Sequence, residues 1–228
     1  MFDRTFVINL DRRPDRWREF QRRFPAGWPF AHPELFSAVD GSVGPIPSYF
    51  RGGPGAWGCL QSHLRIWEQQ VSEGLGSVLV LEDDAVFCRD AIQIMQETMS
   101  IVPADWHQVY FGGQHMLTSE RPPEVVVQGK LIRCRAVNRT HAYAISREFA
   151  AEALAHIANS AWPYNERFHH IDYRLEELHD SHRVYAPWRF CIGQARGASD
   201  VRNHGNRPAR CMEHFWNQFP IIEPAGVA

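Results

Sequence analysis

Short apolar segments alternate with amphipathic segments along the first half of the chain. Residues 6–10 and 77–81 have the length and apolar character of buried strands, and a shorter strand is expected at 35–39. Residues 14–24 and 57–73 carry large apolar side chains at helical spacing, with a Gly- and Pro-rich loop expected at 44–55 between them. A helix at 90–102 and a strand at 109–111 follow. Strands and helices that alternate in this way predict an α/β fold with a mostly parallel sheet flanked by helices.

The pattern changes in the second half of the chain. Residues 125–127 and 131–135 flank Gln128-Gly129-Lys130 and predict a small antiparallel hairpin. A strand is expected at 142–145, and Ser146 is expected to cap a helix that ends near residue 157. A helix at 171–180 and a strand at 184–186 complete the pattern. Because we find neither a repeat nor a clean linker, residues 1–228 are expected to form a single domain, with halves at 1–115 and 116–228.

Composition narrows the classes of protein to consider. The net charge of −2 gives no general attraction for nucleic acid, and the 44% of hydrophobic residues suits a folded domain. No segment reaches the roughly 18–20 apolar residues of a membrane span, and Asp3 and Arg4 do not suit a signal peptide. We therefore expect a cytoplasmic protein with no integral membrane segment and no nucleic-acid partner. Scattered cysteines predict buried, reduced thiols rather than a disulfide framework: Cys59, Cys88, Cys134, Cys191 and Cys211.

Three adjacent acids, Glu82, Asp83 and Asp84, follow the most apolar strand directly. Ligands of open α/β sheets bind outside the carboxyl ends of the strands, and crowded carboxylates favour a positive partner there. A hard divalent cation, Mg²⁺ or Mn²⁺, fits oxygen ligands of this kind. Alternate positions of an extended backbone point the same way, so Glu82 and Asp84 are expected to share the cation while Asp83 faces elsewhere. The alternative is an acidic helix cap or a solvated turn.

Several blocks within residues 5–90 resemble one known family in the same order. The segment Val-Leu-Val-Leu-Glu-Asp-Asp-Ala-Val-Phe at 78–87 resembles the Asp-x-Asp-type motif of glycosyltransferase family 25, which includes bacterial lipopolysaccharide glycosyltransferases and relatives of collagen galactosyltransferases. Residues 6–17 resemble its opening strand, 36–41 its Ala-Val-Asp-Gly block, and 55–67 its Gly-Cys-x-x-Ser-His helix. After residue 115 the resemblance is limited to 140–146 and to 194–200, where the spacing of a Gln-x-x-x-Ser-Asp ending is altered.

This resemblance implies the GT-A nucleotide-sugar fold and inverting transfer of a hexose. The donor would be a nucleotide-diphosphate sugar, the acceptor a glycan or another hydroxyl compound, and the cofactor Mn²⁺ or Mg²⁺. A role in cell-surface glycan synthesis of the lipopolysaccharide type is the expected setting. Residues 1–115 would then bind the sugar nucleotide, and residues 116–228 would form the acceptor side and a polar tail.

Sugar transfer needs charge neutralisation on the leaving diphosphate, a held nucleotide and a base for the acceptor hydroxyl. Glu82 and Asp84 are assigned to the cation, with Asp200 and His204 as candidate further ligands. Asp172 is the candidate base, although an acid at the start of a helix is also a common N-cap. The candidates for donor binding are Asn9, Leu10, Arg12, Arg16, Asp40, Gln61, Ser62, His63 and Asp83.

Other interpretations remain open. Arg12 and Arg16 also fit helix-surface arginines, Asp40 a simple turn residue, and His63 a core histidine. At the level of function, the alternatives are a nucleotide-sugar-binding protein without transfer activity, or a nucleotidyltransferase or metal phosphohydrolase on a similar sheet. The last two classes usually carry a lysine in a Gly-rich loop, and Lys130, the sole lysine, lies in the predicted hairpin turn instead.

Overall fold

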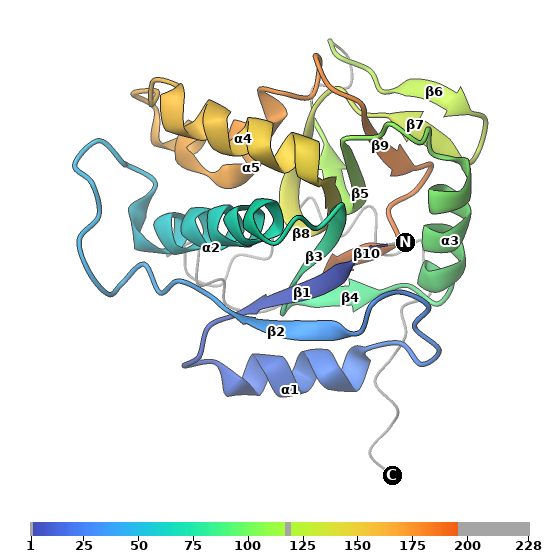
Figure 1. Cartoon of the computed structure of the whole chain (residues 1–228), viewed down its shortest axis with the longest axis horizontal. Helices are drawn as coiled ribbons and strands as arrows, with labels where there is room; N and C mark the ends of the chain where they lie inside the picture. The colour runs from blue at the N-terminus through green and yellow to red at the C-terminus, as the bar shows by residue number, and fades with distance from the viewer. Residues whose placement is uncertain (1, 117–119, 196–228) are drawn as a thin grey trace.

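The computed structural model describes residues 2–116 and 120–195. A sheet of 8 strands forms its centre, in the order β2-β1-β3-β8-β5-β9-β7-β6 (Figure 1). Only β8 and β7 run against the direction of the other strands of this sheet, so the predicted α/β class with a mostly parallel sheet is confirmed. The strands are β1 (Arg4–Asn9), β2 (Pro33–Ser37), β3 (Ser77–Glu82), β5 (Gln108–His115), β6 (Glu124–Val127), β7 (Leu131–Arg133), β8 (Val137–Ser146) and β9 (Val184–Pro187).

Helices cover both faces of this sheet. One face carries α2, α4 and α5, and the other carries α1 and α3 (Figure 1). The alternation of side chains along β3 explains why both faces are dry: Val78 and Val80 belong to the first core, whereas Leu79 and Leu81 belong to the second. The helices are α1 (Pro14–Arg23), α2 (Gly53–Ser72), α3 (Ala91–Ile101), α4 (Arg147–Asn159) and α5 (Ile171–Glu176), with a 3-10 turn at Glu166–His169.

Most expected elements are present, including the hairpin of β6 and β7 and the cap of α4. The Ser146 Oγ accepts a hydrogen bond from the Phe149 N–H at 3.2 Å. Two helix boundaries differ from expectation. The helix α2 begins at Gly53, inside the expected loop, because Pro54 suits the first turn of a helix. The helix expected at 171–180 ends at Glu176.

A second, 2-stranded sheet was not predicted. Strand β4 (Ala85–Phe87) pairs antiparallel with β10 (Ile192–Gln194), so that Ala85 lies opposite Gln194. This pairing brings a late segment of the chain beside the residues that follow β3. None of the helices in the described ranges has the length and apolar character needed to cross a bilayer.

Candidate active site

The acids lie at the carboxyl end of β3, beside the carboxyl end of the neighbouring parallel strand β1. Strands β1 and β3 are paired so that Ile8 lies opposite Glu82, and Asn9 therefore lies beside the turn that carries Asp83. The Asn9 Nδ2 donates a hydrogen bond to Asp83 Oδ2 at 2.6 Å. The first turn of α1 contributes Arg16, whose Nη2 lies 2.7 Å from Asp83 Oδ1 and 3.2 Å from an Asp84 oxygen. One guanidinium thus neutralises part of the acidic cluster from the α1 side.

Asp84 is the member of the cluster with the least favourable environment. Its Oδ1 is buried and has no hydrogen-bond partner among the described residues. Burial, and then the negative charge of Glu82, raise the pKa of Asp84 to about 7, and Arg16 offsets only part of this effect. A divalent cation would satisfy the buried oxygen and remove the repulsion, so the site suits Mg²⁺ or Mn²⁺.

The pKa of Glu82 is shifted in the direction opposite to that of Asp84. Its Oε1 accepts a hydrogen bond from Thr140 Oγ1 on β8 at 3.1 Å and lies 3.8 Å from His63 Nε2. Burial opposes ionisation of Glu82, but the interactions with His63, His141 and Thr140 together outweigh it, and the net effect lowers the pKa. One carboxylate therefore ionises readily, whereas its neighbour retains a proton close to neutral pH.

The second half of the chain closes the other side of the cluster. The Gln194 Nε2 on β10 approaches Asp84 Oδ2 at 3.5 Å, and the Gln194 Oε1 accepts a hydrogen bond from Arg139 Nη1 at 2.8 Å. The backbone N–H of Arg139, a residue with a φ of 74°, donates to Asp172 Oδ2 at 3.2 Å. These bonds link the candidate base to the acidic cluster through Arg139 and Gln194.

The pKa of the Cys59 thiol is affected by the same acids. Burial raises its pKa, and the negative charges of Glu82, Asp172 and Asp84 raise it further. The hydrogen bonds through Arg139 and Gln194 connect Asp172 to Asp84, so Asp172 belongs to the same network as this candidate cation ligand. Sequence reasoning placed Asp172 and the acids separately and did not bring them together.

At the ends of β1 and β2, Arg12 and Asp40 form an ion pair of 2.7 Å. Hydrogen bonds from Ser42, and then the bond from Arg12, lower the pKa of Asp40 to about 2. Leu10 and Gln61 are half-buried. The side chains of Arg12 and Asp40 remain reachable from solvent.

Ser62 and His63 have partners inside the protein. The Ser62 Oγ accepts a hydrogen bond from the Val39 N–H at 2.9 Å and donates one to the Gly58 carbonyl at 2.7 Å. The fully buried His63 places its Nδ1 2.8 Å from the Tyr143 hydroxyl. Two further candidate ligands, Asp200 and His204, lie outside the described residues.

Sequence reasoning missed Thr140, Arg139 and Gln194 as members of the site. Thr140 and Gln194 each lie in a block with family resemblance, so the blocks offered a signal for both. Arg139 offered none, because its role depends on a positive φ and on the pairing of β10 with β4.

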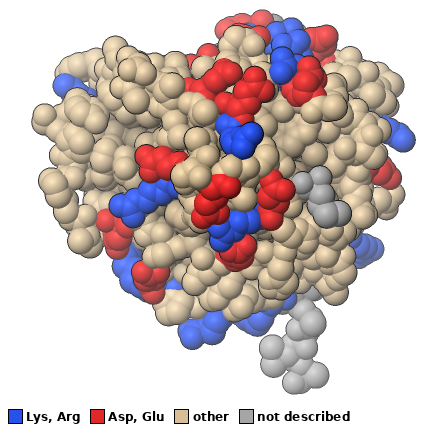
Figure 2. Space-filling view, viewed as in Figure 1, with Lys and Arg blue, Asp and Glu red and all other residues tan. Residues whose placement is uncertain are grey.

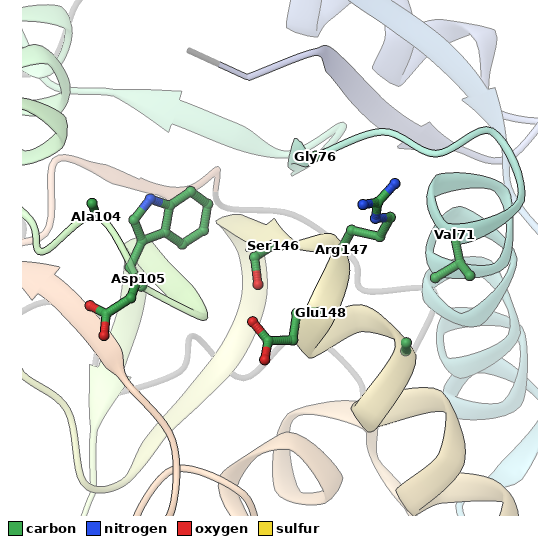
Figure 3. A pocket seen from close by; sticks show the side chains of 9 residues that line it. Val71, Gly76, Ala104, Asp105, Ser146, Arg147 and Glu148 are labelled. Carbon is green, nitrogen blue, oxygen red and sulfur yellow. The ribbon is translucent and has the colours of Figure 1, made fainter.

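Two hollows on the surface are lined by residues other than Glu82, Asp83 and Asp84. The hollow of Figure 3 is lined by Gly76, Asp105, Ser146 and Glu148 and lies at the amino end of β3, opposite to Glu82. A second hollow lies along α1, against Asp15 and Arg22. In Figure 2, acidic and basic side chains are mixed on the face shown, which carries no extended basic patch.

Comparison with known proteins gives a family and several relatives. The model of "Glycosyltransferase family 25 (LPS biosynthesis protein)" matches residues 53–172. Procollagen galactosyltransferase 1 of Danio rerio is 34% identical over 55% of this chain and 24% of its own length. A probable inactive glycosyltransferase 25 family member 3 of Bos taurus is 33% identical over 68% of this chain and 29% of its own length.

This chain spans less than a third of the length of these relatives. Among solved structures, mannose-1-phosphate geranyltransferase of Thermus thermophilus is 14% identical over 82% of this chain and 59% of its own, with a TM-score of 0.40.

Proposed function

This chain belongs to glycosyltransferase family 25, and we propose that it transfers a hexose from a nucleotide-diphosphate sugar to an acceptor hydroxyl, with inversion and with a divalent cation. The observation that carries the proposal is the buried, unpartnered Oδ1 of Asp84 beside the charge of Glu82 at the carboxyl end of β3. Such an arrangement is costly unless a cation neutralises it during the catalytic cycle.

Glu82 and Asp84 are proposed to hold Mn²⁺ or Mg²⁺, with Asp200 and His204 as further candidate ligands. When bound, the cation supplies Lewis acidity that stabilises the charge of the departing diphosphate. The chain itself prepares the site: Thr140 fixes the Glu82 carboxylate, and Gln194 approaches the Asp84 carboxylate from the opposite side.

The donor is proposed to lie along the ends of β1 and β2. Arg12 and Asp40 are exposed enough to contact the nucleotide, and Arg16 is placed to bind phosphate while it balances Asp83. Leu10 and Gln61 would line this side, and Asp83 would face the ribose or sugar. Because Asn9 Nδ2, Ser62 Oγ and His63 Nδ1 bond inside the protein, these three residues are proposed to position the donor-binding groups.

The acceptor is proposed to approach from residues 116–195, where Asp172 would take the proton of its hydroxyl. The family description favours a cell-surface glycan of the lipopolysaccharide type as the acceptor. A cytoplasmic location is proposed from the sequence alone. Similarity to a procollagen galactosyltransferase makes a protein-linked hydroxyl the second candidate acceptor.

A thermal-shift panel of nucleotide sugars with and without Mn²⁺ tests this proposal, because a ligand that binds only the folded state raises Tm. We expect a shift that needs both donor and cation and that is lost in Glu82→Gln and Asp84→Asn. Glu97→Gln, an exposed acid on α3, is the matched control and should keep the shift. If no nucleoside diphosphate binds with either Mn²⁺ or Mg²⁺, the proposal is wrong.

Turnover separates the remaining alternatives. Hydrolysis of the donor, or its transfer in an acceptor screen, supports the transferase. Donor binding without either reaction would place the chain with the inactive family members. Release of pyrophosphate from a nucleoside triphosphate would favour a nucleotidyltransferase.

A further inference from the structure

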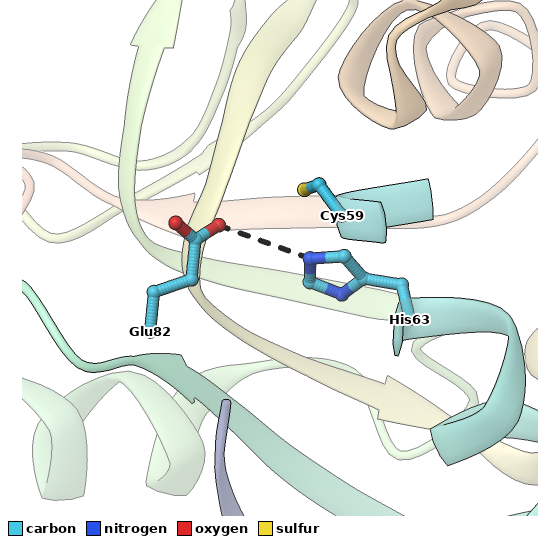
Figure 4. Close-up of side chains that lie close together, drawn as sticks. All are labelled: Cys59, His63 and Glu82. Carbon is cyan, nitrogen blue, oxygen red and sulfur yellow. Dashed lines mark ion pairs between the residues drawn. The ribbon is translucent and has the colours of Figure 1, made fainter. Parts of the chain in front are cut away.

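A sulfur, a nitrogen and an oxygen ligand converge beside the acidic cluster. Cys59 and His63 lie one turn apart on the same face of α2, and both point toward Glu82 at the end of β3 (Figure 4). Their Sγ, ring nitrogen and carboxylate oxygen all lie within 4.8 Å of one another. The set is not a chance surface cluster, since His63 is fully buried and Cys59 and Glu82 are half-buried.

His63 supplies an independent indication that a ligand belongs here. Its Nε2 is buried and has no hydrogen-bond partner among the described residues, and it lies 3.8 Å from Glu82 Oε1. A buried polar atom left without a partner destabilises the fold. Its other ring nitrogen lies 2.8 Å from the Tyr143 hydroxyl, which also accepts a hydrogen bond from Trp67 Nε1 at 3.0 Å.

This outer contact has the form found at metal-binding histidines. When Nδ1–H donates to the Tyr143 hydroxyl, the Nε2 lone pair points toward Glu82 and is free to bind a cation. Tyr143 and Trp67 hold the ring in that orientation from inside the core. The contacts of Tyr143 and Trp67 therefore fix the orientation of the His63 ring before any cation binds.

We propose that Cys59, His63 and Glu82 form a zinc site. One thiolate, one imidazole and one carboxylate are ligands that zinc accepts and that Mn²⁺ and Mg²⁺ do not select. Tetrahedral zinc with bonds of about 2.0–2.3 Å separates its ligand atoms by roughly 3.3–3.8 Å, so side-chain adjustments of about 1 Å complete the site. Binding releases the Cys59 proton to solvent, forms the S–Zn, N–Zn and O–Zn bonds, and leaves a fourth position open.

Zinc at this position would compete for Glu82. This consequence rests on the proposed function, in which Glu82 also holds Mn²⁺ or Mg²⁺. With zinc bound, Glu82 would no longer be available as a ligand for the Mn²⁺ or Mg²⁺ that Asp84 also binds, and transfer would be inhibited. Zinc would thus regulate an enzyme that uses Mn²⁺ or Mg²⁺. The binding of zinc itself does not depend on transferase activity.

Cobalt(II) titration of the whole chain tests the site, because Co²⁺ replaces zinc and gives a charge-transfer absorption when a thiolate binds it. We expect this band in the wild-type protein and its displacement by Zn²⁺. Cys59→Ser should abolish it, and His63→Gln should weaken cobalt binding at least about 10-fold. Cys88→Ser and Cys211→Ser are matched controls that should retain the band; the hydroxyl of a serine at 88 can replace the thiol that donates to Asp90. A band that survives Cys59→Ser overturns the proposal.

A second measurement needs no variant and so does not depend on correct folding of a mutant. Zinc should slow the alkylation of Cys59 by iodoacetamide, as read by peptide mass spectrometry, and Mg²⁺ should not. Equal alkylation with and without zinc would contradict the site. If the cobalt band and the protection are present but no sugar donor binds, the zinc site stands and the proposed function fails. If zinc inhibits transfer by the wild type and by Cys59→Ser equally, the competition for Glu82 is wrong.

Discussion

At the scale of single residues, the ionised form of Asp84 that the proposed cation site needs is also the form that destabilises the fold. Its folded-state pKa of about 7 lies above the ordinary value of 3.8 because of burial and then the charge of Glu82. The folded state therefore holds this proton more tightly than the unfolded chain, and stability contributed by the protonated form is lost as pH rises from about 4 to about 7. At higher pH the ionised group destabilises the fold unless a cation is bound.

Asp84→Asn should therefore make the cation-free protein more stable at about pH 8, by about 1–3 kcal/mol, and much less so near pH 5. Asparagine cannot ionise, and Arg16 keeps its ion pair with Asp83. Urea unfolding at the two pH values, with EDTA present, measures the effect. Asp15→Asn, an exposed acid whose pKa is lowered by its hydrogen bond to Arg13, is the matched control and should give no gain. A loss of stability in Asp84→Asn at about pH 8 would contradict this account.

The same proton predicts how cation affinity depends on pH. Because Asp84 must lose its proton before it binds Mn²⁺, the affinity should rise about tenfold for each pH unit below about 7 and level off above it. Isothermal titration with Mn²⁺ between about pH 5.5 and pH 8 measures the slope. Glu82, with its lowered pKa, contributes little to the slope in this range. An affinity that does not change with pH would show that Asp84 is not a ligand.

At the scale of elements, the start of α2 is fixed by contact between two glycines. A Cβ on Gly58 would lie 2.4 Å from the Val39 carbonyl oxygen and 2.8 Å from the Gly41 nitrogen. No side chain fits between the backbone of α2 and the turn that follows β2. This contact holds Cys59, Gln61 and His63 at their distance from the strand ends.

Gly58→Ala should cost at least about 2–3 kcal/mol and lower Tm, because backbone atoms on both sides must move. Gly129→Ala is the control: it has a φ of 70° and open space around it, so its cost is limited to about 1–2 kcal/mol of left-handed strain. Thermal and urea unfolding of the two variants separate steric overlap from backbone strain. Equal costs would show that the turn after β2 can move away from α2.

Local patterns were sufficient to predict most elements and the acidic cluster. The apolar run before Glu82 predicts a buried strand, and the strand end then predicts where the carboxylates lie. The pairing of β4 with β10 was not predictable, because each strand has 3 residues and the partners lie more than a hundred positions apart. The antiparallel direction of β8 depends on tertiary packing, so the block at 140–146 marks Thr140 as a candidate without predicting its contact with Glu82.

At the scale of the whole molecule, the second half of the chain folds into the sheet of the first. Strand β8 inserts between β3 and β5, and β10 pairs with β4 on the other side of the acids. Hydrogen bonds through Arg139 and Gln194 therefore link Asp172 to Asp84, although the two acids come from distant parts of the sequence. The site exists only when both halves are folded together.

This link makes Asp172 the residue that best tests whether the site performs transfer. Asp172→Asn keeps an oxygen that can accept the Arg139 N–H but removes the ability to take a proton, so kcat should fall about 10²–10⁴-fold with KM for the donor little changed. The thermal shift with donor and Mn²⁺ should be retained, because the carboxylates that hold the cation are intact. Asp180→Asn, an exposed acid paired with Arg121, is the control and should keep wild-type kcat. If kcat is unchanged in Asp172→Asn, the bond to Arg139 marks Asp172 as a support for the 139–140 backbone, and the base must be sought elsewhere around the acidic cluster.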